Sequence, residues 1–467
     1  MRYPSLGRQK LGRVPGMTDN SSHPPGLKRR EVLALGAAGV SMAGLGGLGS
    51  LGLSAPAYAA DAPVPSKARI VIAGAGAAGL AFAAQLAQRV TGASITLVDA
   101  RKAHFYQPGY TLVAAGLKPG SYTVSETASY VPSGVSWIEE GVAEFDPEGN
   151  SLTTEKGRKI PYDFLVVASG LKLDYAAIDG MDVTRIGQDG LGSHYHSAEG
   201  AEATWQAMSN FADKGGVGVF LRPATEMKCA GAPLKYTFIT DDVLRKRGTR
   251  GKADLVYAAQ NKALFSVPIV SEKVRMLFRD RGIATRYDHV MTGIDLGKRE
   301  AVFQTPDGPS RISYDFINVI PPMRAVDAVR NSPLRWQEGP FAADGWVEVD
   351  KASLRHKRFA NVWAVGDAAG VPKGKTAASV KWQVPVAVDH LVATLAGGSS
   401  KAAYNGYTSC PLITRLGRAM LVEFDYDNNL VPSFPGVIAP LEELWITWVM
   451  KTIALKPTYL AMLHGNA

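Results

Sequence analysis

The sequence predicts an α/β protein with two Rossmann-like dinucleotide-binding domains and a C-terminal amphipathic, membrane-facing region. Three observations support this: a glycine-rich strand–turn–helix segment after residue 67, a second region from Gly216 that also begins with an apolar strand, and an aromatic, proline-rich tail after about residue 400. With 467 residues and 46% hydrophobic content, the chain has room for two or three packed units.

The first unit begins with residues 69–73 (RIVIA), an apolar run typical of a buried parallel strand. A helical Ala/Leu-rich stretch at 80–90 and a second strand at 95–98 follow. Residues 74–79 (GAGAAG) between them match the GxGxxG fingerprint, in which the glycines allow a tight turn against a pyrophosphate. We expect Gly74, Gly76, Ala78 and Gly79 to cradle a dinucleotide and Asp99 to bond its ribose.

A weak internal repeat indicates a second, related unit. Residues 162–170 (YDFLVVASG) are echoed by 314–322 (YDFINVIPP), each being Tyr-Asp followed by an apolar strand. Residues 361–367 (NVWAVGD) then form a strand that returns to the first unit. This segment resembles the second FAD motif of the two-dinucleotide-binding-domain flavoproteins, which implies that Gly366 and Asp367 contact the ribityl chain. The stretch ending at Gly170 resembles their third landmark, so we expect FAD.

The second unit lacks a glycine fingerprint. After the strand at 217–221, residues 222–233 read RPATEMKCAGAP, with prolines and a methionine where backbone amides would cradle a pyrophosphate. The pyridine-nucleotide site is therefore expected to be lost, and electrons are not expected to come from NADH. A cysteine, Cys229, occupies the neighbourhood instead.

The two cysteines of the sequence lie in distinctive segments, KCAGAPLK (228–235) and YNGYTSCPL (404–412). Together with the FAD landmarks, these segments resemble the sulfide:quinone oxidoreductases, from about Lys67 to the C-terminus. The resemblance implies that Cys229 and Cys410 are a redox pair that accepts sulfide sulfur. Flavocytochrome sulfide dehydrogenases share the architecture, but a Pro-Pro-Gly run typically follows their first cysteine and is absent here.

The resemblance also implies a mechanism. Hydrosulfide attacks the Cys229–Cys410 disulfide or a sulfur-bridged form of it, leaving a persulfide and a thiolate that reduces the flavin. Lysines flanking Cys229 favour the thiolate. A structural bridge is the alternative, because closing so long a loop stabilises a fold by about 4–5 kcal/mol on the chain-entropy model.

The same resemblance bears on the attachment of FAD and on Gln107, while the roles of Lys375, Thr376 and two histidines are interpreted from the residues themselves. Some members bind FAD covalently through a third cysteine, and the matching stretch here (192–196, GSHYH) has none, so non-covalent FAD is expected. Gln107 matches an FAD contact. Lys375 and Thr376 are expected to open a helix towards the flavin, with an exposed capping turn as the alternative for Lys375. His194 and His196 are interpreted as ordinary polar residues.

The tail at 441–463 holds two apolar stretches, interrupted at Lys456-Pro457 and each too short to span a bilayer. Leu444, Trp445, Trp448 and Val449 share a helical face, which suits an interfacial helix. A domain-packing helix, or burial in a homo-oligomer, is the alternative. Lys451 matches a family position that serves the quinone carbonyl, so we expect it to donate a proton to membrane quinone.

The N-terminus has the features of an export leader. Residues 28–33 (KRREVL) form a twin-arginine pattern, a Gly/Ala-rich run follows, and Ala57-Tyr58-Ala59 suits cleavage. We therefore expect a periplasmic, peripheral membrane protein; an uncleaved anchor is the alternative. The first 60 residues carry +5 of the net charge of +9 and no basic stripe follows, which argues against nucleic-acid binding.

These features predict a leader at 1–60, an FAD-binding domain at 67–180 and 326–395, a second Rossmann-like domain at 181–325, and a redox-cysteine and membrane-interface region at 396–467. The expected partners are hydrogen sulfide, a small sulfur acceptor and membrane quinone. One alternative is the flavoprotein subunit of a sulfide dehydrogenase that donates electrons to cytochrome c. The haem would have to belong to a separate partner, because the chain has no Cys-x-x-Cys-His motif. Another is a flavin-binding protein without catalysis.

Overall fold

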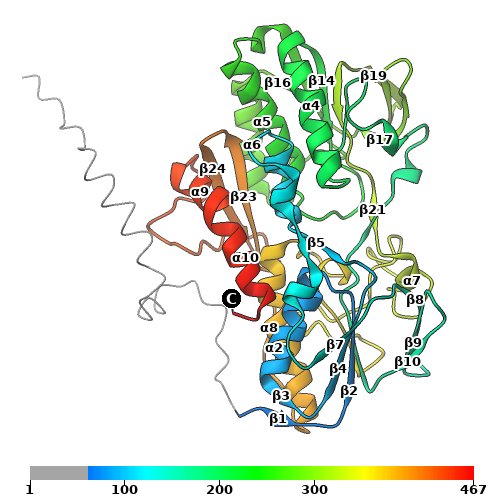
Figure 1. The fold of residues 1–467 in the computed structure, drawn as a ribbon. Coiled ribbons are helices and arrows are strands. Elements are labelled where there is room, and N and C mark those ends of the chain that lie inside the picture. Colours follow the sequence, from blue (N-terminus) through cyan, green and yellow to red (C-terminus); the bar gives the residue numbers. More distant parts are fainter. Residues whose placement is uncertain (1–61, 467) are drawn as a thin grey trace, which may run out of the picture. The chain divides into compact units, whose positions relative to one another are not determined.

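The computed structural model describes residues 62–466. The leader expected at 1–60 therefore lies outside the described part of the chain. Within residues 62–466 there are two five-stranded parallel sheets, each packed against helices (Figure 1). This arrangement confirms the predicted α/β class with two Rossmann-like units.

The first sheet has the strand order β22-β11-β2-β4-β7. Its central strand is apolar and buried at four of its five positions, as expected for a parallel strand covered on both faces. β22 pairs with β11, so the chain returns to the first unit as the sequence predicts. The strands are β2 (Arg69–Ala73), β4 (Ser94–Val98), β7 (Val135–Ile138), β11 (Phe164–Val167) and β22 (Val362–Ala364). Helices α2 (Ala77–Arg89) and α8 (Ala377–Leu395) pack against each other beside this sheet (Figure 1).

The second sheet has the order β13-β20-β14-β15-β16. Its strands are β13 (Leu191–Gly192), β14 (Gly216–Leu221), β15 (Ala253–Ala258), β16 (Ile283–Arg286) and β20 (Phe316–Asn318). The accompanying helices are α4 (Ala198–Lys214), α5 (Ala232–Lys246) and α6 (Pro268–Asp280). The predicted repeat is borne out, because β11 and β20 are the strands of the two Tyr-Asp segments.

Smaller elements complete the two units. Two antiparallel sheets of three strands comprise β8 (Val142–Asp146), β9 (Ser151–Thr154) and β10 (Lys159–Pro161), and β17 (Val290–Asp295), β18 (Glu300–Thr305) and β19 (Gly308–Ser313). The short strands are β1 (Val64–Pro65), β3 (Val90–Thr91), β5 (Ala103–Phe105), β6 (Val124–Glu126), β12 (Lys172–Leu173) and β21 (Met323–Arg324), and the short helices are α3 (Tyr110–Val113) and α7 (Asp327–Arg330).

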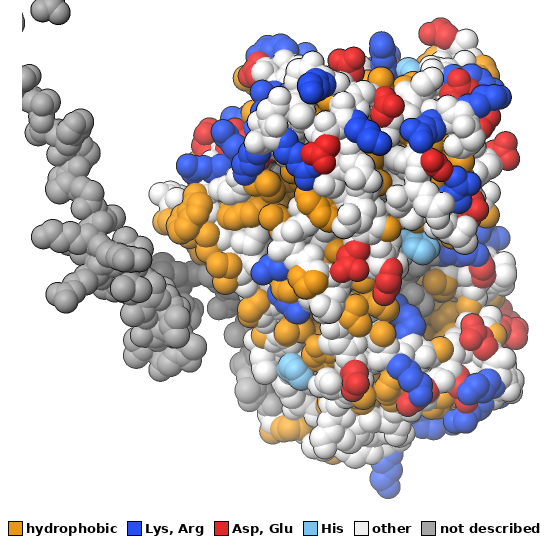
Figure 2. Space-filling view, turned by 45° about the horizontal axis from the view of Figure 1, so that its top comes forward, with side chains coloured by type: hydrophobic (Ala, Val, Ile, Leu, Met, Phe, Trp, Pro, Cys, Tyr) orange, Lys and Arg blue, Asp and Glu red, His pale blue; other side chains and the backbone are white. Residues whose placement is uncertain are grey.

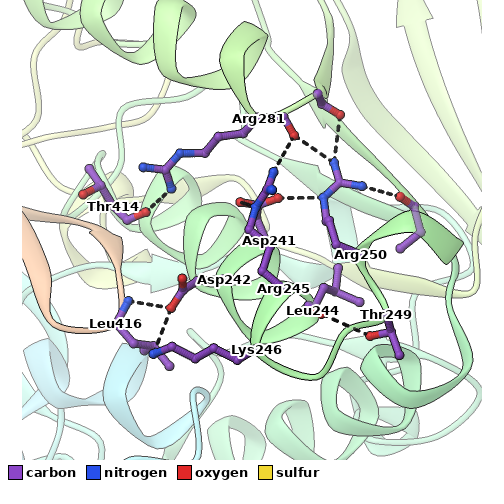
Figure 3. Close-up of polar contacts among 12 residues, drawn as sticks. Asp241, Asp242, Leu244, Arg245, Lys246, Thr249, Arg250, Arg281, Thr414 and Leu416 are labelled. Carbon is purple, nitrogen blue, oxygen red and sulfur yellow. Dashed lines mark hydrogen bonds and ion pairs between the residues drawn. The ribbon is translucent and has the colours of Figure 1, made fainter. Parts of the chain in front are cut away.

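A C-terminal hairpin, β23 (Thr408–Arg415) and β24 (Arg418–Phe424), packs against α5. Figure 3 shows the polar contacts that hold it there. The Asp242 carboxylate accepts a hydrogen bond of 2.9 Å from the backbone N–H of Leu416, and Arg281 donates to the carbonyl of Thr414. Because Cys410 lies on β23 and α5 begins just after Cys229, these contacts fix the two cysteine segments relative to each other.

The C-terminal helix differs from the sequence prediction. α9 (Trp445–Val449), a π-helical turn (Met450–Ala454) and α10 (Leu455–Leu463) follow one another directly, so Pro457 does not interrupt the helix. A proline is tolerated there because it lies in the first turn after the π segment, where an i→i−4 hydrogen bond is already lost. Among the described residues, no helix is long and apolar enough to cross a bilayer.

The predicted apolar face is also partly wrong. Trp448 packs inward against a hydrophobic core cluster, while Trp445 is 58% exposed. The exposed large apolar side chains of this helix are Trp445, Ile446 and Ile453. Leu444 is the extended N-cap residue of α9 and lies outside the helix, and within α9 Trp448 turns towards the core.

Candidate active site

A cavity of about 1430 Å³, space open to solvent at its mouth included, lies at the carboxyl ends of β2, β11 and β22. The loop after β14, the β23 strand and the C-terminal helix complete its wall. Ligands of open α/β sheets bind at this edge. The cavity therefore has the position of a dinucleotide site.

The glycine turn forms one end of the cavity. Gly74 has φ of +114°, and a Cβ there would overlap the carbonyl of Ala168. Gly79 packs on the carbonyl of Gly74, while Gly76 and Ala78 line the cavity. Helix α2 starts directly after Gly76, so its free N–H groups and positive dipole end face this space. These features fit a pyrophosphate.

Asp99 is engaged within the protein. Its carboxylate accepts hydrogen bonds from the Ala75 N–H at 2.8 Å and from the Arg101 guanidinium at 2.7 Å. Burial opposes ionisation, but the hydrogen bonds and charge of Arg101 hold the pKa of Asp99 below its usual value. Arg101 lines the cavity and Asp99 does not, so the ribose contact assigned to Asp99 stays a prediction.

The second and third landmarks lie directly beside the glycine turn. Gly366 has φ of +71° and lies against Ala78, which joins the two FAD segments. Gly170 and Asp367 line the cavity, and burial raises the pKa of Asp367. The glycine cradle and the residues that line the cavity together fit FAD.

Lys375 and Thr376 lie where α8 begins. The Thr376 hydroxyl accepts a hydrogen bond from the Ser379 N–H and caps the helix. The Lys375 ammonium donates to the carbonyls of Asp367 and Ala369 at 2.8 and 3.0 Å and lies over the Trp346 ring. Burial lowers the pKa of Lys375 to about 8. Its ammonium thus ties α8 to the Asp367 turn, and its contact with a flavin stays a prediction.

Cys229 lies in a strained backbone conformation in the loop between β14 and α5. Its φ is +49°, which a residue with a side chain rarely adopts. The Tyr195 hydroxyl lies within hydrogen-bonding distance of two carbonyls of this loop, 2.8 Å from that of Lys228 and 3.0 Å from that of Cys229. The Cys229 N–H donates to the Lys375 carbonyl at 2.9 Å. These contacts fix the loop where relatives that use pyridine nucleotides would bind their cofactor.

Cys410 approaches the same loop from β23. It is 4% exposed, and a Cβ added to Gly231 would lie 2.5 Å from its sulfur. Both cysteines are thiols in this structure, and both line the cavity. The structure therefore brings together two residues 181 positions apart in the sequence, as the redox-pair hypothesis requires.

The electrostatics of the pair are unequal. The neighbouring Cys410 thiol, then Lys235 and Lys451, lower the pKa of Cys229 against the effect of burial. The hydrogen bond with Cys229, then burial and the charge of Cys229, raise the pKa of Cys410. Lys235 is 2% exposed, and its ammonium donates to the Cys229 sulfur at 3.3 Å. Cys229 is thus the thiolate of the pair.

Lys451 and Gln107 lie at the cysteine end of the cavity. The Lys451 ammonium is buried, donates to the Pro108 carbonyl at 2.8 Å, and its pKa is lowered to about 7, first by burial and then by Lys235. The Gln107 side chain accepts a hydrogen bond of 2.6 Å from Lys228. Lys451 can therefore exchange a proton near neutral pH, whereas its contact with quinone stays a prediction.

Several cavity residues were not assigned from the sequence. The sequence indicates Lys235 only as a charge near Cys229. A spacing of six residues does not predict that its ammonium donates a hydrogen bond to the Cys229 sulfur. The sequence predicts no role for Tyr195 and Arg101, because no motif marks them, and it gives His194 only the interpretation of an ordinary polar residue. Tyr195 and His194 follow β13 and reach the cysteine loop only through the packing of the second sheet.

The profile of the pyridine nucleotide-disulphide oxidoreductase family matches residues 68–389. The match covers more than half of the chain and spans both parallel sheets, so the protein is an oxidoreductase of this class. The class is defined by its dinucleotide-binding fold, which agrees with the glycine cradle at Gly74–Gly79 and the turn at Asp367.

Two curated relatives narrow the assignment. The mitochondrial sulfide:quinone oxidoreductase of Mus musculus is 36% identical over 369 residues, covering 78% of this chain and 80% of the mouse protein. The Dictyostelium discoideum protein of the same description is 35% identical over 79% of this chain and 80% of its own length. The crystal structure of the Aquifex aeolicus sulfide:quinone oxidoreductase shares the fold, with a TM-score of 0.70 at 20% identity over 86% of this chain and 92% of that chain.

The chain therefore belongs to the sulfide:quinone oxidoreductase family. Membership implies a flavin cofactor, FAD, in agreement with the cavity.

Proposed function

We propose that this protein oxidises sulfide to sulfane sulfur or polysulfide through the Cys229–Cys410 pair and passes the electrons by way of FAD to membrane quinone. The observation that carries the proposal is the convergence of both cysteines with a buried lysine in the cavity that the glycine turn and Asp367 also line. Family membership supports sulfide as substrate and quinone as acceptor.

The protein's own residues perform the sulfur chemistry. Hydrosulfide attacks the oxidised pair, so one sulfur–sulfur bond breaks and another forms, leaving a persulfide on one cysteine and a thiolate on the other. Lys235 stabilises the thiolate of Cys229, and Lys451 supplies or removes a proton nearby. The outer sulfur of the persulfide passes to a small acceptor, which leaves both cysteines reduced. FAD, when bound, would accept the two electrons that are released as the Cys229–Cys410 disulfide forms again.

FAD is held without a covalent bond in this proposal. The two cysteines of the sequence both belong to the redox pair, and Gly192–His196 offers no thiol. The glycine turn, Gly170, Gly366 and Asp367 hold the cofactor by hydrogen bonds and by the dipole of α2. Release of intact FAD from protein denatured in acid tests this point, and FAD that stays attached to the chain contradicts it.

The exposed apolar side chains at the C-terminus support peripheral attachment to a membrane. Val437 is 80% exposed, Trp445 58%, Ile446 44% and Ile453 67%. Hydrophobic side chains gather over this part of the surface in Figure 2. Exposed apolar patches of this kind mark interaction sites, and a tryptophan suits the bilayer interface. The twin-arginine pattern at 28–33 supports the periplasmic face as the location.

Membrane attachment is testable with lipid vesicles. We expect the double variant Ile446→Glu/Ile453→Glu to cosediment with vesicles less than wild type, because two charges would enter the apolar interface. Gln304→Glu/Gln188→Glu, which adds the same charge at exposed polar positions, is the matched control. Equal cosedimentation of both variants with wild type contradicts the proposed membrane surface.

The redox proposal is tested by adding sulfide to the FAD-loaded protein without oxygen. We expect the flavin absorbance to bleach in wild type and to stay unchanged in Cys229→Ala and Cys410→Ala. Adding decylubiquinone or cytochrome c to the reduced protein then identifies the acceptor, since the proposal predicts faster reoxidation by the quinone. Activity retained in both single variants, or reoxidation by cytochrome c alone, contradicts it.

A further inference from the structure

His194 is buried at the cysteine end of the cavity. It follows β13, is 2% exposed and lines the cavity wall. Its ring stacks on Tyr236 with 4.9 Å between ring centroids, and it lies 4.9 Å from the ring of Tyr195. Two aromatic neighbours thus hold the plane of the imidazole in one orientation.

Asn318 on β20 decides which ring nitrogen carries the proton. Its Oδ1 lies 3.0 Å from Nδ1 of His194 and 3.4 Å from the backbone nitrogen of the same residue. A backbone N–H can only donate, so the amide atom that faces both nitrogens is the oxygen. His194 must then donate through Nδ1–H, which leaves Nε2 without a proton.

The remaining nitrogen has no partner. Nε2 of His194 is buried and makes no hydrogen bond with the described residues. Burial lowers the pKa of His194 to about 4, so the ring is neutral at physiological pH and Nε2 is a hydrogen-bond acceptor only. A buried acceptor is costly unless a ligand or water donates to it. The site therefore calls for a ligand that carries a hydrogen-bond donor.

Neighbouring contacts place this acceptor beside the redox pair. Tyr236, which stacks on His194, follows Lys235 on α5, and Lys235 donates to the Cys229 sulfur. The charge of Lys235 also contributes to the low pKa of His194. Tyr195, the next residue, bonds the carbonyl of Cys229. His194, Lys235 and Cys229 thus line the same cavity, with His194 close enough to Lys235 for its charge to act on the imidazole.

We propose that His194 is a catalytic residue that binds the incoming sulfide, its Nε2 accepting a hydrogen bond from the substrate S–H while Lys235 faces the substrate sulfur. The inference rests on the proposed function. Hydrogen sulfide and hydrosulfide both carry an S–H donor on a polarisable sulfur, so each matches this acceptor and cation. Quinone carbonyls only accept hydrogen bonds and cannot satisfy Nε2, so the position selects the sulfur substrate over the electron acceptor.

The test compares His194→Phe with His196→Phe in the FAD-loaded protein. Phenylalanine keeps the stack on Tyr236 but removes the acceptor, so we expect the KM for sulfide to rise about tenfold in His194→Phe with little change in kcat. His196 is exposed and lies outside the cavity lining, so its variant serves as the matched control and is expected to behave as wild type.

A second readout does not depend on turnover. A short pulse of sulfide on the oxidised protein adds one sulfur atom to the cysteine pair, which intact-protein mass spectrometry detects, and the sulfide concentration for half-maximal addition should rise in parallel in His194→Phe. Asn318→Leu removes the acceptor that fixes the proton on Nδ1 of His194, so it should also raise the KM and the sulfide concentration for half-maximal sulfur addition. This variant provides the test if His194→Phe does not fold.

Unchanged KM and unchanged sulfur addition in a folded His194→Phe overturn the inference, as does an equal rise in His196→Phe. Wild-type protein that gains no sulfur and shows no flavin bleaching contradicts the proposed function instead, which separates the two failures.

Discussion

Replacing Lys235 by methionine tests how the protein makes Cys229 the reactive thiolate. The ammonium of Lys235 is 3.3 Å from the sulfur and 2% exposed, so solvent screens this contact little. A hydrogen bond between charged groups contributes about 1.5–3 kcal/mol, and about 1.4 kcal/mol corresponds to one pKa unit. The Cys410 thiol, the largest cause of the lowered pKa of Cys229, stays in place. We therefore expect Lys235→Met to raise the pKa of Cys229 by roughly 1–2 units.

The assay is the rate of alkylation of the reduced protein by iodoacetamide across pH, with the Cys229 peptide quantified by mass spectrometry. The thiolate is the reactive form, so the midpoint of the rate profile reports the pKa of Cys229. Lys228→Met is the matched control, because the neighbouring Lys228 ammonium bonds Gln107 and not sulfur. A midpoint that does not move in Lys235→Met, or moves equally in both variants, refutes this account of the thiolate.

Further predictions concern geometry, stability and electron source. Gly231→Ala would place a Cβ 2.5 Å from the Cys410 sulfur, so sulfide-driven bleaching should be lost while FAD content, measured by absorbance, stays normal. The pKa of Cys229 is lower in the folded protein than in the unfolded chain, so its ionisation stabilises the reduced protein fully above about pH 8.5, and this stabilisation is lost as the pH falls through the folded pKa. The free energy of unfolding in urea should therefore change less with pH in Lys235→Met than in wild type. Arg281→Met removes bonds to Thr414 and Glu443, so the free energy of unfolding in urea should fall by about 1–3 kcal/mol; an unchanged value contradicts the anchoring of the hairpin. NADH should not bleach the flavin, because the loop around Cys229 replaces the nucleotide cradle.

Local patterns in the sequence were enough for the first unit. The glycines at 74, 76 and 79 have a fixed spacing set by one turn, and strand, turn and helix are contiguous, so the sequence alone placed the cradle. The return of the chain at β22 was also predicted, because a second apolar run ends in Gly366-Asp367. Each of these features depends on residues that are close in sequence.

Residues that act through tertiary packing were missed or assigned wrongly. The tautomer of His194 depends on Asn318, 124 positions later on another strand. The Asp99 carboxylate forms an ion pair with Arg101. The spacing of Asp99 from the glycines predicts a ribose contact but does not reveal this ion pair. The sequence predicts an interruption at Pro457, because a proline usually breaks a helix. The π turn that accommodates this proline has no sequence signature, so the continuous helix could not be predicted.

The surroundings of Lys451 could not be predicted from the resemblance. Its contact with quinone stays a prediction, and the structure adds that its ammonium lies close enough to Cys229, Cys410 and Lys235 for their charges to act on it. A residue number can be carried over from a motif, but the direction in which a side chain points depends on the helix that carries it. The π turn containing Lys451 sets that direction here.

The most direct test of the central claim is sulfide-driven reduction of the flavin, followed by its visible absorbance without oxygen. The account predicts that wild-type protein bleaches with stoichiometric sulfide and that neither Cys229→Ala nor Cys410→Ala does so at equal FAD content. Wild-type flavin that stays oxidised with sulfide, or that is bleached by NADH instead, would contradict it.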